Sequence, residues 1–112
     1  MAAPRKKHQS RSVERHFDRP RSAVWPLILA AVDSSPAEPL AIEAPWRLCS
    51  EDAGSYPDLD FFQGTFVIRD DGPTCHVSWG LVFDPEPTEA GLAAAESALA
   101  ETAALLDRLA GY

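Results

Sequence analysis

The 112-residue chain has few of the residues that metal and redox sites require. It contains two cysteines, three histidines, and neither Cys-x-x-Cys nor His-x-x-x-His spacing. A structural zinc site needs four such ligands at short spacing, and the sequence also has no glycine-rich phosphate loop. We therefore expect no metal and no cofactor. Cys49 and Cys75 are predicted to be reduced, buried thiols, with a cross-strand disulfide as the alternative.

Long hydrophobic runs are also missing. The longest extends from Ala23 to Val32 and is interrupted by Pro26, whereas a membrane-spanning helix needs about 20 apolar residues. The basic residues near the N-terminus have no apolar run behind them, unlike a secretory signal. These features predict a cytoplasmic protein with no membrane span.

Positive charge is scarce outside the N-terminal segment. The net charge is −7, which divides into +5 for residues 1–21 and −12 for the remainder. An acidic body argues against nucleic-acid binding, because phosphate contacts need clustered cations. Residues 1–10 show no periodicity and are predicted to be a disordered, solvated basic tail, although contact with an anionic surface is an alternative. The predicted domain is therefore 11–112.

The C-terminal stretch from Thr88 to Tyr112 has the strongest local pattern. Alanine, leucine and glutamate favour a helix, Thr88 is a suitable N-cap, and Gly111 is a suitable stop. One helical stripe is predicted to be buried; it contains Leu92, Ala95, Leu99, Thr102, Leu106 and Leu109. A helix with one apolar side needs a partner surface, since isolated helices are marginal in water.

Two alternating segments provide that surface. The segments 61–69 and 74–83 are predicted to be strands joined by the turn Asp70-Asp71-Gly72-Pro73. Alternation in the second segment places Trp79 on an apolar face and His76 on a polar one. Such a pattern predicts an antiparallel sheet with one buried and one solvated face.

The N-terminal half is less regular. A strand is predicted for 11–18, with Val13 and Phe17 on one side, and Asp18 is the expected helix cap. The stretch Arg21 to Asp33 is helical, but Pro26 predicts either two short helices or one bent helix. After a loop at 34–39, the segment Leu40 to Ser50 is predicted to be one strand with Pro45 at its start or edge.

Three segments together resemble the START-like superfamily, also called SRPBCC, Bet v 1-like or helix-grip. They are SVERHFDRPRSAVWPLI (12–28), FFQGTFVIRDDGPTCHVSWGLVFDP (61–85) and the closing AALLDRLAGY (103–112). The resemblance implies an α+β fold in which a small antiparallel sheet packs on a long C-terminal helix, with a broken N-terminal helix pair. The sequence departs from the family in its centre, where about three strands are missing. A shortened sheet is expected to leave an open edge, which can pair with another chain.

In this family the sheet and the C-terminal helix enclose a hydrophobic cavity. The aromatic residues here fit two interpretations, because they can line such a cavity or form the core of a small domain. If the cavity is present, the expected ligand-binding residues are Trp25, Phe66, Trp79, Leu99, Thr102 and Leu106. The nearest other polar side chains are expected to be Tyr56, Arg47 and Arg69. Thr102 can bond a ligand or its own helix backbone.

Three functions follow as hypotheses. The first, implied by the resemblance, is non-catalytic binding of a small hydrophobic molecule. The second is an enzyme of the polyketide cyclase or dehydratase type, although no catalytic residues can be assigned, because His16 and His76 lack a nucleophile and acid in a recognisable motif. The third is a cavity-less interaction module that forms a homodimer. An exposed strip of Ala93, Ala100 and Ala104 permits close helix packing in a dimer, or simply reflects helix propensity.

Overall fold

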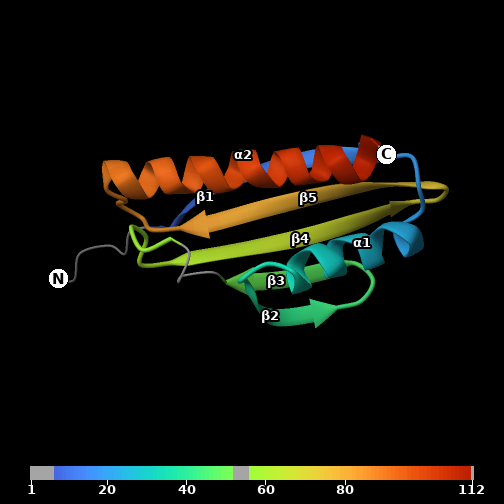
Figure 1. Ribbon diagram of the computed structural model, residues 1–112, viewed down its shortest axis with the longest axis horizontal. Coiled ribbons are helices and arrows are strands. Elements are labelled where there is room, and N and C mark those ends of the chain that lie inside the picture. The colour runs from blue at the N-terminus through green and yellow to red at the C-terminus, as the bar shows by residue number, and fades with distance from the viewer. Residues whose placement is uncertain (1–6, 52–55, 112) are drawn as a thin grey trace.

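The computed structural model describes residues 7–51 and 56–111, and within these ranges the chain is α+β. It forms one five-stranded antiparallel sheet and two helices (Figure 1). Of the predicted N-terminal tail, residues 1–6 lie outside the described residues. Gln9 and Ser10 belong to the first strand, so the ordered domain begins two residues earlier than predicted.

The sheet has the strand order β1-β5-β4-β3-β2. Its strands are β1 (Gln9–Phe17), β2 (Glu38–Glu43), β3 (Arg47–Glu51), β4 (Phe62–Asp71) and β5 (Thr74–Phe83). The first strand therefore pairs with the last one, and the β2 strand forms the far edge. This order brings the N-terminal and C-terminal parts of the chain together along one side of the sheet.

The β4–β5 hairpin confirms the predicted alternation. Phe66 lies opposite Trp79 in the register, and both side chains are buried. Gly72 adopts a φ of 74° in the turn, and its N–H donates to the Asp70 carboxylate at 3.1 Å. Glycine is favoured there because a side chain is strained at positive φ.

The α2 helix (Glu89–Gly111) begins as predicted. Thr88 caps it, because its hydroxyl accepts a hydrogen bond from the Gly91 N–H at 3.0 Å. Its buried face is rotated from the predicted leucine stripe toward small residues. Gly91, Ala95, Ala98 and Leu106 are buried, whereas Leu92, Leu99 and Leu109 are half-buried against the same core. Small residues let the helix approach a sheet face that is covered with aromatic rings.

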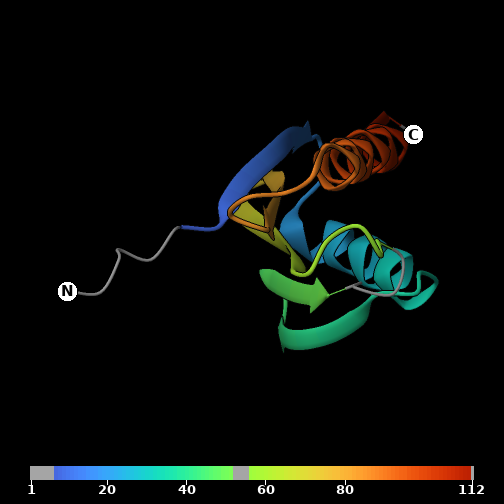
Figure 2. The same ribbon diagram turned by 90° about the vertical axis from the view of Figure 1, so that its left-hand side faces the viewer.

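The position of α2 on the Trp79 side of the sheet was also predicted. The helix lies over β1 and β5, and Ala95, Ala98 and Leu106 share one core cluster with Trp79 (Figures 1 and 2). Arg15 of β1 bonds Asp107 at 2.6 Å. Arg19 donates to the Leu109 carbonyl, which places a cation at the negative end of the helix.

The N-terminal helical stretch is one helix, α1 (Arg21–Asp33), so of the two predicted alternatives the single helix forms, and the broken helix pair implied by the resemblance is wrong. Pro26 lies inside it and removes a bond to the Ser22 carbonyl. Both residues are exposed, so water can satisfy that carbonyl. Pro20 occupies the N-cap position, and Asp18, the predicted cap, bonds His16 at 3.0 Å instead.

The single strand predicted for Leu40 to Ser50 is also wrong. The segment forms the β2–β3 hairpin, whose turn contains Pro45 after a cis peptide bond. Arg47 closes the turn by bonding Glu43 at 2.7 Å. The sheet therefore has one more strand than the sequence indicated.

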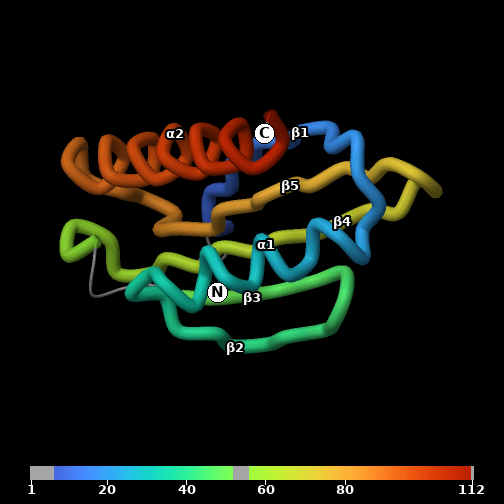
Figure 3. Tube along the Cα trace, turned by 45° about the vertical axis from the view of Figure 1, so that its right-hand side comes forward, coloured from blue at the N-terminus to red at the C-terminus, as the bar shows by residue number. Residues whose placement is uncertain are grey.

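Both helices cover the same face of the curved sheet. In Figure 2 they lie on one side of it, and Figure 3 shows α1 beside β3 and β4 while α2 follows β1 and β5. The opposite face of the sheet carries the polar side chains. Among the described residues, neither helix has the length and hydropathy of a membrane-spanning segment.

Gly64 of β4 allows the core to close, and its substitution should be costly. A Cβ atom there would lie 2.6 Å from two atoms of the Trp79 indole ring. We predict that Gly64→Ala lowers the free energy of unfolding by roughly 1–3 kcal/mol, because the ring must move within a packed interior. Urea denaturation measures this loss. Gly80→Ala, where a Cβ meets nothing within 4 Å, is the control and should retain full stability.

Candidate functional site

A cavity of about 130 Å³ lies between the two helices and the core face of the sheet. Its walls come from α1, the loop after it, strands β3 to β5, and α2. The described lining residues are Ala31, Val32, Ser35, Ala37, Ser50, Tyr56, Phe62, Phe66, Trp79, Ala98, Thr102 and Leu105. The location corresponds to the one implied by the family resemblance, with α1 as an additional wall.

Aromatic rings form the floor of this cavity. The Trp79 indole passes over Gly64, and its centroid lies 6.3 Å from Phe62 and 6.2 Å from Phe66. Tyr56 stacks on Phe62 with centroids 4.3 Å apart and an interplanar angle of 12°. The missing side chain of Gly64 therefore provides the slot in which the indole lies flat.

Five polar side chains line this largely apolar space, and Ser50, Trp79 and Thr102 are three of them. Ser50 lies on β3, directly opposite Gly64 of β4. The Trp79 indole nitrogen lies over Gly64. Thr102 faces the cavity from α2. Within the described part of the chain, these three side chains make no hydrogen bond to protein. Fully enclosed polar side-chain atoms in the same part of the chain all have partners, so these three atoms are not fully enclosed and keep some accessible surface.

Half of the predicted ligand-binding residues line the cavity. Phe66, Trp79 and Thr102 do so. The side chains of Trp25 and Leu106 are buried in the core outside the lining, and Leu99 is half-buried against that core. Their helical spacing correctly indicated that they contact the core, but spacing alone could not show which core residues border empty volume.

Sequence reasoning missed several wall residues. Ser50 lies on β3, whose pairing with β2 and β4 has no clear signal in the sequence, and Ala98 lies on α2 beside the larger leucines that dominate its helical pattern. Tyr56, which was predicted to be one of the polar side chains nearest the cavity, lines it. Arg47 and Arg69 do not, because Arg47 bonds Glu43 and Arg69 lies on the opposite face near Glu14.

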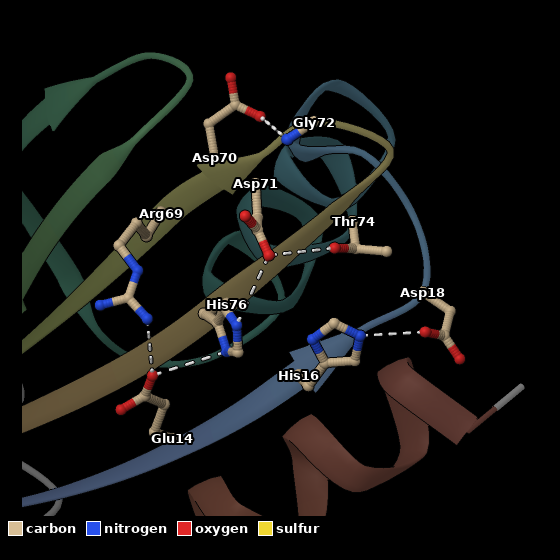
Figure 4. Close-up of polar contacts among 9 residues, drawn as sticks. All are labelled: Glu14, His16, Asp18, Arg69, Asp70, Asp71, Gly72, Thr74 and His76. Atoms are coloured by element: carbon tan, nitrogen blue, oxygen red, sulfur yellow. Dashed lines mark hydrogen bonds and ion pairs between the residues drawn. The ribbon is translucent and has the colours of Figure 1, made fainter.

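The outer face of the sheet carries a charged network (Figure 4). The Glu14 carboxylate lies 3.5 Å from Arg69 and 3.7 Å from His76, and His76 is 4.0 Å from Asp71. His16 is the register partner of His76, and their ring centroids are 4.9 Å apart. The prediction that His76 lies on the polar face is therefore confirmed, and His16 lies beside it.

This network borders a groove of about 330 Å³ that Trp46 also lines. Its cations face carboxylates: Arg69 faces Glu14, and Arg21 lies 3.9 Å from Asp70. Among the described residues, no group of three or more His, Cys, Asp or Glu side chains has the geometry to hold a metal ion. The smaller interior cavity, with unpaired polar atoms and apolar walls, is therefore the better candidate for binding a ligand.

Both cysteines are free and buried. Cys49 is on β3 and Cys75 on β5, with β4 between them. Two strand spacings are about 10 Å, which exceeds the reach of a disulfide, so the alternative of a cross-strand bridge is wrong. Burial, followed by the nearby Asp70 carboxylate, raises the pKa of the Cys75 thiol.

That shift predicts a loss of stability in alkali. Above pH ~8.5 the thiol ionises in the unfolded chain but stays protonated in the folded one. The unfolded state then binds fewer protons, so the free energy of unfolding falls as pH rises. Urea titrations between pH 8 and 10 should show a shallower decline for Cys75→Ala than for the natural chain. Equal slopes would contradict the prediction.

With its fold and cavity described, the chain can be placed beside known proteins. A scan against protein-family models finds no match, and neither does a search of the curated proteins. The crystal structure of TTHA0849 from Thermus thermophilus matches with a TM-score of 0.51 at 18% identity. The match covers 92% of this chain and 95% of that one. At this identity the likeness concerns the fold alone.

Proposed function

We propose that this chain is a shortened START-like protein that binds a small hydrophobic molecule, without catalysis, between its sheet and C-terminal helix. The arrangement of α2 across the core face of an antiparallel sheet supports the family assignment. We also propose a cytoplasmic location, which the two free thiols support.

The observation that carries the proposal is the cavity beside Trp79. Ligand sites are typically apolar spaces with a small number of polar groups, and this cavity has aromatic rings with three unpartnered polar atoms. These atoms are accessible and have no protein partner among the described residues. A bound molecule with a matching polar group can therefore form hydrogen bonds with them in place of solvent.

The enzyme alternative has less support. The described lining contains no carboxylate, histidine, lysine or arginine. General acid–base catalysis of a cyclisation or dehydration requires a group positioned to move protons near neutral pH. The hydroxyls here are better suited to hydrogen bonding than to proton transfer.

Native mass spectrometry of protein purified from its source provides the first test. A co-purified mass that dissociates on collisional activation is expected. Its absence from every preparation, together with no response to added toluene or phenol, would contradict the proposal.

A cavity-filling substitution gives a sharper test. Ala98 is buried in the cavity wall, whereas Ala100 is exposed on the same helix. We predict that Ala98→Leu abolishes the rise in melting temperature that toluene produces, because the new side chain occupies the cavity. Ala100→Leu should retain the full rise. Equal responses of the two variants would place toluene elsewhere.

A homodimer is a second candidate, supported by the β2 edge. Leu40 and Ile42 are each 50% exposed on this outermost strand. Exposed apolar edge strands are sites of pairing between chains. We predict that light scattering after size exclusion detects a dimer that Ile42→Lys dissociates; a monomer at high concentration would eliminate this candidate.

A further inference from the structure

We infer that the cavity selects an uncharged molecule about the size of one aromatic ring, with a hydroxyl or carbonyl group bound beside Ser50 and Trp79. This inference rests on the proposed function and specifies its ligand class. It follows from three independent properties of the cavity: the charge of its walls, its volume, and the placement of its polar atoms.

The described walls offer a charged ligand no opposite charge. No described lining residue carries a formal charge, and the ion pairs of the network in Figure 4 lie on the other face of the sheet. A carboxylate or ammonium group in the cavity would lose its hydration without gaining an opposite charge. Burial of an unpaired charge is far more costly than burial of a hydroxyl.

The volume of the cavity matches a single ring. The cavity measures about 130 Å³, and an apolar protein cavity of about 150 Å³ is known to accommodate one benzene molecule. Two fused rings would exceed this volume, so either the walls would move apart or part of the ligand would extend into solvent on the side of the exposed residue Ser35. The flat indole of Trp79, flanked by Phe62 and Phe66, gives a ring a surface on which to pack.

The polar atoms define where the oxygen of the ligand lies. The Trp79 indole nitrogen is a donor only, so it requires an acceptor such as a hydroxyl or carbonyl oxygen. The nitrogen lies over Gly64, and Ser50 is directly opposite Gly64 on β3. Ser50 is 8% exposed, and its hydroxyl has no partner among the described residues. Thr102 adds a second hydroxyl from the helix wall.

The test follows the Trp79 indole N–H signal in ¹H–¹⁵N NMR spectra of the full chain. Trp25→Phe and Trp46→Phe variants assign the three tryptophan signals. The probes are phenol, toluene, benzoate and 2-naphthol. Phenol should shift the Trp79 signal and bind ~3- to 10-fold more tightly than toluene, as expected for one hydrogen bond. Benzoate should bind at least ~100-fold more weakly than phenol, and 2-naphthol should leave the signal unchanged.

Matched variants separate the polar contact from the packing. Ser50→Ala should weaken phenol ~3- to 10-fold and leave toluene binding unchanged, which also shows that the cavity is intact. Ser78→Ala, on the outer face, is its control. Thr102→Val should also weaken the binding of phenol and leave the binding of toluene unchanged. Thr65→Val, on the outer face of the sheet, is its control.

The outcomes distinguish this inference from the proposed function. The inference is overturned, and the function retained, if benzoate or 2-naphthol binds as tightly as phenol, or if Ser50→Ala weakens phenol and toluene equally. It is also overturned, with the function again retained, if neither phenol nor toluene binds but a larger apolar molecule co-purifies. If no molecule binds and none co-purifies, both fail.

Discussion

The fit of the Trp79 indole over Gly64 is the contact on which the rest of the structure depends. It fixes the positions of Phe62 and Phe66 on either side, and these three rings define the floor beneath both helices. Because the floor is bulky, the facing side of α2 is built from Ala95 and Ala98 rather than from leucines. Protein interiors pack closely, so one indole ring in place determines how near the helix can approach.

The two helices divide the same sheet face between them. The α2 helix is anchored to β1 by the Arg15–Asp107 bond and by packing, whereas α1 lies over β4. The cavity lies where their coverage meets, bordered by Val32 on one side and Leu105 on the other. Its volume is therefore set by helix placement as well as by side-chain size.

The parts of the fold that could be predicted are those with strong local signals. Residues 74–83 alternate without interruption, and the strand there has the predicted bounds. Pro45 was misinterpreted because proline is compatible with both a strand start and a turn, and only the pairing of β2 with β3 distinguishes these. Pro26 does not interrupt α1, because the effect of proline on a helix depends on whether the freed carbonyl reaches water, and the sequence alone does not show this.

The candidate site was half predictable for a related reason. Sequence periodicity identifies residues that face the core, and Phe66, Trp79 and Thr102 were found in this way. Unfilled volume is a property of the whole packing arrangement. Residue spacing therefore could not show that Ser50 lines the cavity or that Leu99 does not.

The placement of both helices on one side of the sheet has a consequence for the other side. Residues such as Glu14 and Arg69 lie on the uncovered side, so substitutions there leave the described lining of the interior cavity unchanged.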